Sequence, residues 1–357
     1  MEAPRKAAGG RRPTSKDVAA AVGVSRSAVS FAFNDPGRIS AATRERILAT
    51  AQEMGYTPNT LARMLKAGQT QSLGVLLPQS LAKIMENPYY SRFFMGIGQV
   101  CDREGFTLLL TPPLTDSMLK AIPYAGADGF IVCGLENDRG EVAELRRRNV
   151  PFVLVDGDPP EGVPSVDVDD RRGAREVVQH LIQQGHRRLA VLSIDPGPDA
   201  AQRGYHGPLA RRMAGITESL TESGLNWDDV VLSEVPCTRM DGYAATRSLF
   251  FEVAPEKRPT AVVALSDVLA IGAVDALRDL GLSIPGDVSV TGFDDLPEAS
   301  WMRPRLTTVR QPITSKGRTA ADYLISAIRG EDQHPHQALG TTLVVRDTTG
   351  HVPGRAG

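Results

Sequence analysis

The feature that most constrains this chain is a series of helix-start and helix-stop signals within residues 13–68. Thr14 and Asp17 have the spacing of a capping box, and an apolar stripe follows them as far as Gly23. Ser25 can cap a second helix, so the turn between the two helices is very short. A short turn that contains glycine holds two short helices at a steep angle. We therefore expect a helix-turn-helix unit near the start of the chain.

The second helix is expected to run from residue 26 to residue 33. Its apolar residues fall on one side, which suits a small core of three helices. The side chains expected on the other side are Arg26, Ser27, Ser30 and Phe31. Ser40 can cap a third helix, whose apolar stripe ends before Gly55. Residues 13–57 should therefore form a small all-α domain whose second helix is placed to enter a DNA major groove.

A further signal begins at Pro58, in the segment of residues 58–70. Its stretch LARMLKAG has room for about two helical turns, which is too short for a helix that is stable alone in water. We therefore expect this segment to need another part of the assembly to hold it in place.

Three stretches of this region resemble the DNA-binding headpiece and hinge of the lactose repressor (LacI/GalR) family of bacterial transcription factors. They read SKDVAAAVGVS, VSFAFND and ISAATRERILATAQEMGYTPNTLARMLKAG. The resemblance implies that the hinge orders only when two subunits pair on a DNA operator, and that Leu65 then enters the minor groove. An apolar wedge of this kind partly unstacks and kinks DNA. The implied hinge contacts to DNA are Asn59, Ala62, Arg63 and Leu65.

The resemblance also implies roles within the headpiece. Arg26 and Ser27 fall where the family reads bases, and an arginine fork can bond a guanine edge twice. Phe31 stands where many relatives have a polar or basic reader, so it either contacts a thymine methyl group or packs. The candidates for backbone contact are Thr14, Lys16, Ser25, Ser30, Asn34 and Arg44. For each of them an ordinary solvated side chain is the alternative.

Charge is distributed unevenly along the chain. The first 68 residues carry 11 Lys and Arg against 5 Asp and Glu, whereas the remainder carries 29 against 37. A basic small domain joined to an acidic larger one confines attraction for DNA phosphates to one end. A solvated surface would explain the charge alone, but the helix-turn-helix spacing favours DNA binding.

Composition indicates a globular cytoplasmic protein. No apolar run approaches the roughly 18 residues that a membrane span needs. Residues 1–12 form a basic arm that we expect to be disordered, and no apolar stretch follows it as in a secretory signal. The three cysteines, Cys101, Cys133 and Cys237, lie in apolar or strand-like contexts, so we expect reduced thiols rather than disulfides or a metal site. Neither a metal nor a cofactor is expected.

From Ser72 onward, short apolar runs alternate with helical patterns, as in parallel sheets covered by helices. The expected strands are residues 73–77, 107–110, 129–133, 152–156, 166–168, 188–193, 230–235, 261–265 and 288–293. The expected helices are residues 93–103, 141–148, 172–184, 210–223, 242–251 and 268–280. Residues 111–125 look too short for a full helix. The cycle restarts near residue 172, which indicates two α/β lobes.

The resemblance extends through this part, in SVDVDDRRGAREVVQHLIQQGHRRLAVLS, SDVLAIGAVDALRDLGLSIPGDVSVTGFDDLPEA, PRLTTVRQP and TTLVVRDTTG. It implies the two-lobed fold of type I periplasmic sugar-binding proteins. By analogy the chain crosses between lobes near Asp169, Pro297 and Ser326. The expected lobes are residues 71–169 with about 298–325, and residues 170–297 with about 326–357.

A ligand should lie beyond the carboxyl ends of the strands. The segment Asn87-Pro88-Tyr89-Tyr90 follows the first strand in a loop and is similar to a family segment that often stacks on the effector, although these tyrosines could instead anchor the loop. The other effector candidates implied by the resemblance are Arg212, Asp267 and Asp294; their alternatives are a surface arginine and loop-capping carboxylates. Where the family usually has Asn before Asp267, this chain has Ser266.

These observations favour a dimeric repressor that binds a pseudo-palindromic operator on double-stranded DNA and is controlled by a small-molecule effector, for which a sugar is the family's commonest case. An activator or dual regulator of the same family is the first alternative, and a ligand-delivering binding protein is another. An enzyme is not indicated, because no phosphate loop, nucleophile elbow, metal cluster or paired-acid motif occurs. The C-terminal residues lack a leucine heptad, so a dimer is expected rather than a tetramer.

Overall fold

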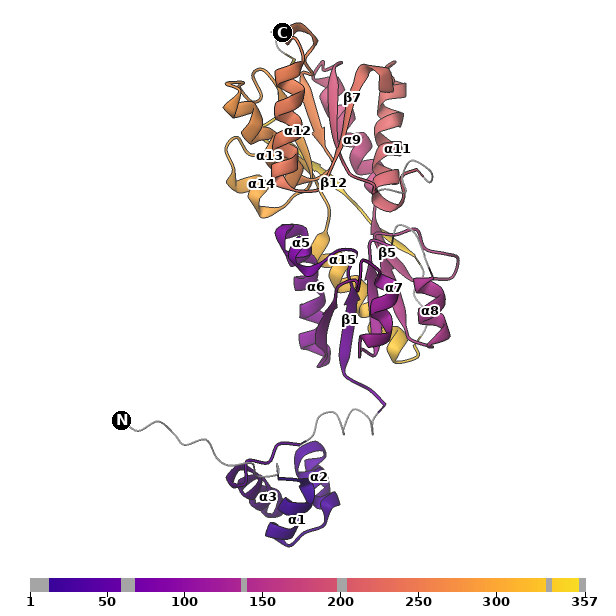
Figure 1. Ribbon diagram of the computed structural model, residues 1–357, viewed down its shortest axis with the longest axis vertical. Helices are drawn as coiled ribbons and strands as arrows, with labels where there is room; N and C mark the ends of the chain where they lie inside the picture. The colour runs from indigo at the N-terminus through magenta and orange to yellow at the C-terminus, as the bar shows by residue number, and fades with distance from the viewer. Residues whose placement is uncertain (1–12, 59–67, 136–139, 198–203, 332–335, 353–357) are drawn as a thin grey trace, which may run out of the picture. The chain divides into compact units, whose positions relative to one another are not determined.

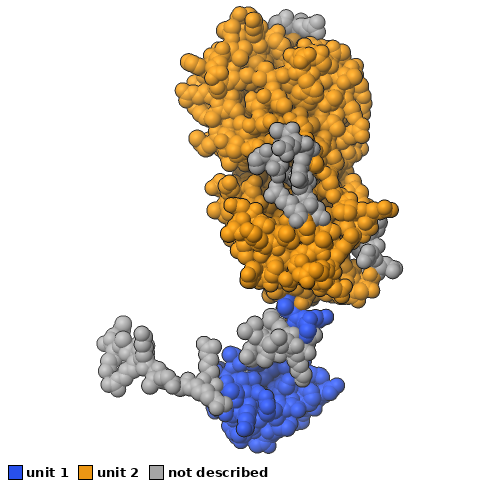
Figure 2. All heavy atoms as spheres, turned by 45° about the vertical axis from the view of Figure 1, so that its right-hand side comes forward, with its two compact units in different colours: residues 1–70 blue, residues 71–357 orange. Residues whose placement is uncertain are grey.

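The computed structural model describes residues 13–58, 68–135, 140–197, 204–331 and 336–352. The chain forms two compact units, residues 1–70 and residues 71–357 (Figure 2). The first is a helical headpiece and the second is an α/β core (Figure 1). Each unit has buried apolar clusters of its own, so each is stabilised by its own core.

The headpiece consists of three α-helices, α1 (Ser15–Val22), α2 (Arg26–Asn34) and α3 (Ala41–Glu53). At the start of α1, the Asp17 carboxylate accepts hydrogen bonds from the backbone N–H and the hydroxyl of Thr14, both at 2.7 Å. The helix ends at Gly23, whose φ of 75° is the left-handed conformation that favours glycine. The expected helix-turn-helix unit is confirmed.

Small side chains form the headpiece core: Val18, Ala19, Val22, Val29, Ala32, Ile47 and Ala51. Two arginines of α3 also donate hydrogen bonds to carbonyl groups of the other two helices. Arg44 Nε donates to the Ala32 carbonyl at 3.2 Å, and Arg46 Nη2 donates to the Val22 carbonyl at 2.8 Å. Carbonyls in the last turn of a helix lack partners within that helix, so these bonds satisfy them and join the three helices.

The N-terminal lobe of the core contains a six-stranded parallel sheet with the strand order β11-β5-β4-β3-β1-β2. Its strands are β1 (Ser72–Leu76), β2 (Thr107–Thr111), β3 (Gly129–Cys133), β4 (Phe152–Val155), β5 (Ser165–Val168) and β11 (Gln337–Leu339). Its helices are α5 (Leu81–Glu86), α6 (Pro88–Glu104), α7 (Met118–Ala121), α8 (Glu141–Arg147) and α15 (Ile313–Ile328).

The C-terminal lobe contains a second six-stranded sheet with the order β12-β10-β9-β8-β6-β7, in which only β12 is antiparallel to its neighbour. Its strands are β6 (Leu189–Ile194), β7 (Val230–Val235), β8 (Ala261–Ala264), β9 (Ser289–Asp294), β10 (Thr307–Arg310) and β12 (Thr342–Val344). Its helices are α9 (Asp170–Gln183), α11 (Gly207–Glu222), α12 (Arg239–Glu252), α13 (Asp267–Asp279) and α14 (Pro297–Trp301).

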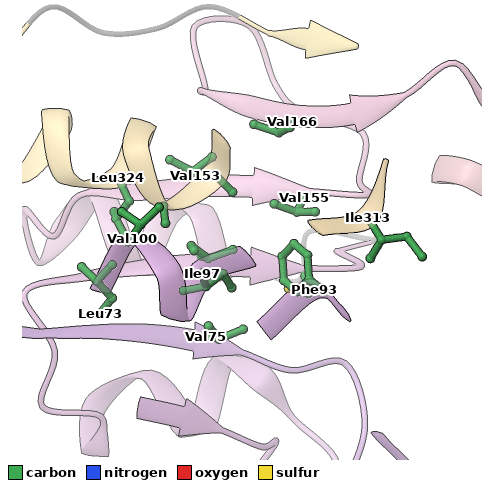
Figure 3. Close-up of a cluster of buried hydrophobic side chains, with 14 of the residues drawn as sticks. Leu73, Val75, Phe93, Ile97, Val100, Val153, Val155, Val166, Ile313 and Leu324 are labelled. Atoms are coloured by element: carbon green, nitrogen blue, oxygen red, sulfur yellow. The ribbon is translucent and has the colours of Figure 1, made fainter. Parts of the chain in front are cut away.

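Central strands such as β3 and β8 are buried along their whole length, as expected of parallel strands covered by helices on both faces. In the N-terminal lobe, side chains from β1 and β4 meet those of α6 and α15 (Figure 3). The expected α/β fold class is therefore confirmed. None of the helices in the described ranges has the length and apolar character that crossing a bilayer would require.

Glycines allow pairs of helices to cross closely over the sheets. Where α6 crosses α15, a Cβ at Gly96 would overlap the backbone of Thr314, and a Cβ at Gly317 would overlap the Phe93 carbonyl. The same arrangement recurs where α9 crosses α11, at Gly215. These contacts fix how the helices that carry the site residues sit on each sheet.

The chain crosses between lobes where a strand of one sheet leads into an element of the other lobe. The first crossing, at Asp169 between β5 and α9, agrees with expectation. The second follows β10, near residues 311–312, and the third lies between β11 and β12. The expected crossings at Pro297 and Ser326 were wrong. Pro297 begins α14, which belongs to the C-terminal lobe, and Ser326 lies inside the continuous helix α15, which packs on the N-terminal lobe.

Most expected strands and helices of the core are present, with ends that differ by a few residues. The segment Asn87-Pro88-Tyr89-Tyr90 is different, because it does not form a loop. Pro88 is the first residue of α6 and Asn87 caps that helix by accepting a hydrogen bond from the Tyr89 N–H at 3.0 Å. Proline suits this position because the first N–H groups of a helix have no partner within it. As expected, residues 111–125 hold only the short α7 and a 3₁₀ turn.

Candidate functional site

The outward face of α2 carries the side chains that the sequence indicated as DNA readers. Ser25 Oγ caps this helix by accepting a hydrogen bond from the Ala28 N–H at 3.1 Å. Arg26, Ser27 and Ser30 are exposed. Within the described part of the chain, Arg26 and Ser27 make no side-chain hydrogen bond, so their polar atoms are available to an external partner.

Phe31 lies half-buried on the same helix and carries an arginine on its ring. The Arg38 guanidinium carbon is 5.3 Å from the centre of the Phe31 ring, within the range of a cation–π contact. Arg38 also pairs with Asp35 at 3.0 Å, and both of these side chains are largely exposed. The Arg38 guanidinium therefore places hydrogen-bond donors beside Phe31, whose own side chain has no donor.

Several of the other candidates for DNA contact in the headpiece also make hydrogen bonds within the headpiece. The Thr14 hydroxyl is bonded to Asp17, and Asn34 Nδ2 donates to the Ser30 carbonyl at 3.0 Å. Arg44 uses its Nε on the Ala32 carbonyl, which leaves the far end of its guanidinium for other contacts. Lys16 is exposed. The expected hinge contacts lie outside the described residues: Asn59, Ala62, Arg63 and Leu65.

A continuous chain of hydrogen-bonded side chains links the two lobes of the core. In the N-terminal lobe, the Tyr89 hydroxyl donates to Asp156 Oδ2 at 2.6 Å, and Lys316 Nζ donates to both Asp156 oxygens at 2.7 Å. Lys316 Nζ also donates to Gln311 Oε1 at 3.0 Å, at the second crossing. Gln311 Nε2 then donates to Asp294 Oδ1 at 2.5 Å, in the C-terminal lobe. These five side chains, Tyr89–Asp156–Lys316–Gln311–Asp294, are called the polar chain below.

Three members of the polar chain, Asp156, Lys316 and Gln311, were not found from the sequence. Lys316 lies on the buried face of α15 and only 1% of its side chain is exposed, so its charge requires a partner. Burial alone would raise the pKa of Asp156, but the Lys316 charge and the bonds from Lys316 and Tyr89 hold that pKa below its ordinary value. A lysine within the apolar periodicity of ITSKGRTAADYLISAI was the available signal for a buried cation. Asp156 directly follows β4, where ligand residues are expected.

Arg212, the effector candidate on α11 of the C-terminal lobe, is buried. Its Nε donates to Asp170 Oδ1 at 2.8 Å and its Nη1 to the Leu265 carbonyl at 2.6 Å. Its guanidinium carbon is 3.7 Å from the centre of the Phe293 ring. Burial would lower the pKa of Arg212, but the charges of Asp170 and Asp294 raise it on balance, so the fork remains charged.

The two carboxylates expected in the site have different environments. Asp294 ends β9, is 5% exposed and accepts a second bond from Ser266 Oγ at 3.2 Å; burial raises its pKa to about 6. Asp267 is 0% exposed. Its oxygens accept from the Thr308 hydroxyl at 2.5 Å and from the Leu296 N–H at 2.7 Å. Asp267 therefore joins β10 to the start of α14. Its fully buried carboxylate has no exposed atom that a ligand could contact.

Residues near the start of α6 bring the N-terminal lobe to the edge of the C-terminal lobe. Asn87 Nδ2 lies 3.9 Å from Cys237 Sγ, which precedes α12. The Tyr89 and Tyr90 rings meet edge to face, with centroids 5.2 Å apart. Burial raises the pKa of the Cys237 thiol to about 11, so it stays protonated at neutral pH. Of the expected effector residues, Asn87, Tyr89, Arg212 and Asp294 border the region between the lobes.

A groove of about 500 Å³ reaches this region from solvent. Asp294, Gln311 and Ile313 line it from within, and Arg92, Arg310 and Arg346 line it toward the outside. Asp295 pairs with Arg310 and with Arg346, each at 2.6 Å. A ligand-sized volume therefore adjoins the end of the polar chain at Asp294.

The titratable side chains of the core do not form a metal-binding cluster in the described part of the chain. Across the described residues, no three His, Cys, Asp or Glu side chains come together in a way that could hold a metal ion. His186 is buried and bonded to Thr260 and to the Gly350 carbonyl, so both of its ring nitrogens are used inside the C-terminal lobe. The side chains around the polar chain offer hydrogen-bond donors and acceptors, and the carboxylates of Asp156 and Asp170 are each paired with a cation.

Comparison with known proteins gives matches along most of the chain. Residues 14–59 match the model of bacterial regulatory proteins of the lacI family, and residues 178–349 match the periplasmic binding protein-like domain. The chain is 33% identical to the HTH-type transcriptional regulator CelR of Thermobifida fusca, over 95% of this chain and 98% of that protein.

Two solved structures show the same architecture. One is the lac repressor dimer bound to operator and the anti-inducer ONPF, with a TM-score of 0.80 and 28% identity, covering 95% of this chain and all of that chain. The other is a complex of the transcriptional regulator CelR with cellobiose, with a TM-score of 0.67 and 31% identity, covering 94% of this chain and all of that chain.

Proposed function

The chain belongs to the LacI family of bacterial regulatory proteins and is a DNA-binding transcriptional regulator rather than an enzyme, and we propose that it is a repressor whose operator affinity is set by a carbohydrate bound between the two lobes of its core. The observation that carries this proposal is the polar chain from Tyr89 to Asp294, because a ligand that bonds to its members must exchange bonds that now link the lobes.

The chemistry around the polar chain favours a neutral ligand rich in hydroxyl groups. Lys316 neutralises Asp156 and Arg212 neutralises Asp170, so a ligand gains little from carrying a net charge. Hydroxyl groups both donate and accept hydrogen bonds, so they can replace the Gln311 and Ser266 bonds to Asp294. One solved neighbour is a complex with cellobiose. We assign effector contact to Asn87, Tyr89, Tyr90, Arg212 and Asp294, and a supporting role to Asp267.

For DNA, we propose base contacts from the exposed face of α2 and phosphate contacts around it. Arg26 and Ser27 are the proposed base readers, and Arg38 beside Phe31 supplies the donor that Phe31 lacks. The proposed phosphate contacts are Thr14, Lys16, Ser25, Ser30, Asn34 and Arg44. A repressor with these contacts works on chromosomal DNA in the cytoplasm, as a homodimer on a pseudo-palindromic operator.

The hinge is proposed to couple the core to DNA, with Leu65 as the minor-groove wedge beside Asn59, Ala62 and Arg63. Leu65→Ala should weaken binding to a palindromic operator by roughly one hundredfold, because the kink is lost, while salt-driven binding to random DNA stays nearly unchanged. Fluorescence anisotropy on both DNAs measures the two affinities. Equal losses on operator and random DNA would refute the wedge.

The effector is tested by thermal shift of the full chain against a panel of monosaccharides and disaccharides that includes cellobiose. A sugar that binds the folded protein raises its apparent melting temperature in proportion to the logarithm of its concentration. Asp294→Asn should abolish the shift, whereas Arg171→Met, which breaks an ion pair within the C-terminal lobe, should not. Transcription from an operator-controlled reporter then separates a repressor from an activator: the proposal requires expression to rise when the regulator is deleted.

A further inference from the structure

Next to Arg212 on α11, Arg211 points at the other lobe. Its Nη2 lies 3.1 Å from Asp167 Oδ1 on β5, and its Nη1 lies 3.5 Å from Asp158 Oδ1 and 3.3 Å from the Gly157 carbonyl. These three partners belong to the N-terminal lobe, whereas α11 belongs to the C-terminal lobe. One guanidinium therefore bridges the two lobes through several oxygens.

The start of α11 reinforces this bridge. The Gly207 N–H donates to Asp158 Oδ2 at 2.9 Å, so the same carboxylate receives the helix N-terminus and the arginine. A carboxylate at a helix N-terminus is stabilised by the helix dipole as well as by the hydrogen bond. A Cβ at Gly207 would come within 3.4 Å of the Asp156 carbonyl, so α11 contacts the segment that leaves β4 closely. Asp156 is the member of the polar chain that begins this segment.

Asp170 connects the bridge to the proposed effector site. This carboxylate is fully buried; its Oδ2 lies 3.3 Å from Arg211 Nε and its Oδ1 lies 2.8 Å from Arg212 Nε. Asp170 also stands directly after the first crossing between the lobes. Arg211 and Arg212 both bond to the Asp170 carboxylate. A shift of either arginine therefore changes the hydrogen bonding of the carboxylate to which the other is bonded.

We propose that Arg211 is a positioning residue that clamps the two lobes through Asp158 and Asp167, and that Asp170, shared with Arg212, relays the state of the effector site to this clamp. The clamp stands on the Arg211 contacts alone, and only the relay rests on the proposed function. When Arg212 moves to meet a ligand, Asp170 shifts, the Arg211 contacts weaken or tighten, and the lobes change their closure. The hinge segments, which precede the core in the chain, would then respond to closure.

The clamp is tested on the full chain without any ligand, by measuring the distance between the lobes. Nitroxide labels are attached through an encoded keto amino acid at Ala143 on α8 and Ala244 on α12, which are exposed and lie in different lobes. Pulsed electron paramagnetic resonance then reports the distance distribution. Arg211→Met should shift the mean to longer distances and broaden it, since losing a coupled cross-lobe contact changes the closed-to-open ratio by roughly tenfold. Arg211→Lys, which keeps the charge, should restore part of the closed population.

The matched control is Arg171→Met, which removes an ion pair between α9 and α11 inside one lobe and should leave the distribution unchanged. Asp158→Asn is the second clamp variant; its side chain is 53% exposed, so the change should not impair folding, and it should open the lobes as Arg211→Met does. If neither variant alters the distances relative to Arg171→Met, the clamp is refuted.

The relay is tested by a double-mutant cycle with Arg212→Lys, again without ligand. Because both arginines bond to Asp170, the effects of Arg211→Met and Arg212→Lys on the closed population should be non-additive. Additive effects would overturn the relay and leave the clamp in place. Since no sugar is used, failure of these tests is distinct from failure of the sugar panel, which concerns the proposed function.

Discussion

The face of α2 that is proposed to read DNA and the polar chain of the core differ in how their side chains are paired. Arg26 and Ser27 are exposed and, within the described residues, have no internal side-chain bond. Lys316 and Asp294 are buried and bonded inside the protein. DNA can therefore bind to α2 without breaking internal bonds, whereas a ligand in the core must exchange them. Only the second kind of binding changes the contacts that set the protein's own shape, which is what an effector must do.

The difference in internal pairing between α2 and the core is tested most strongly by removing one charge from the polar chain. Lys316→Met leaves the Asp156 carboxylate without its cation in a largely buried site, so the free energy of unfolding should fall by about 3–5 kcal/mol. Urea denaturation measures the change. The exposed Lys83→Met on α5 is the matched control and should change stability by less than about 0.5 kcal/mol. If the Lys316 variant were as stable as the Lys83 variant, the Lys316–Asp156 pair would not contribute to the stability of the folded protein.

A substitution on α2 should have the opposite profile. Arg26→Ala should weaken operator binding by about 1–3 kcal/mol and relax specificity at one base position, while the unfolding free energy stays unchanged. Lys16→Ala is the control: it should weaken binding to all DNA sequences alike and reduce the salt dependence by about one unit. Anisotropy titrations on operator variants distinguish the two. Loss of stability in Arg26→Ala would show that this arginine also has an internal role.

The pH dependence of stability should report on the core alone. Burial raises the pKa of Asp294 to about 6, so between its ordinary value and pH 6 the folded protein binds a proton more readily than the unfolded chain. The stability that this carboxyl contributes is present at low pH and is lost as pH rises through 6.

Asp294→Asn removes this contribution and the like charge that helps to raise the pKa of Asp267. From pH 4.5 to 7 the parent protein should lose about 2 kcal/mol more than Asp294→Asn, measured by urea unfolding at each pH. If the unfolding free energies of the parent protein and of Asp294→Asn changed in parallel with pH, the raised pKa of Asp294 would be contradicted.

The smallest expected effect concerns the contact between Arg38 and Phe31. Arg38→Ala removes a cation–π contact at an exposed site, so headpiece stability should fall by only about 0.5 kcal/mol. Operator affinity should fall further if Arg38 supplies the donor beside Phe31. An unchanged operator affinity would restrict Arg38 to packing against the ring.

The two regions also differ in how far sequence predicts them. The headpiece depends on bonds between residues three or four positions apart, such as Thr14 with Asp17 and Ser25 with Ala28, so capping signals and stripes predict its helices. The core site depends on pairs such as Lys316 with Asp156, which are 160 positions apart. No local pattern specifies such a partner. The pattern of α15 could therefore have indicated a buried lysine at most, and never its carboxylate partner.

The errors in the lobe boundaries and at Asn87 have a different origin, because local signals were present there. Expecting a crossing at Ser326 overlooked that the apolar positions of α15 repeat without a break across it, so that one helix packs entirely on the N-terminal lobe. The segment from Asn87 to Tyr90 was placed in a loop, although Asn followed by Pro is also a helix-start signal. The role of Arg211 depends on two carboxylates brought near by folding of both lobes, which spacing along α11 could not reveal.

The most direct test of the account is operator affinity, measured by anisotropy with and without the sugar that produces the largest thermal shift. The account predicts a change of about 5- to 150-fold in the parent protein, and no change in Asp294→Asn or Lys316→Met while their affinity for operator without sugar is retained. A sugar that binds the core but leaves operator affinity unaltered in the parent protein, or alters it equally in both variants, would contradict the claim that ligand and polar chain exchange bonds.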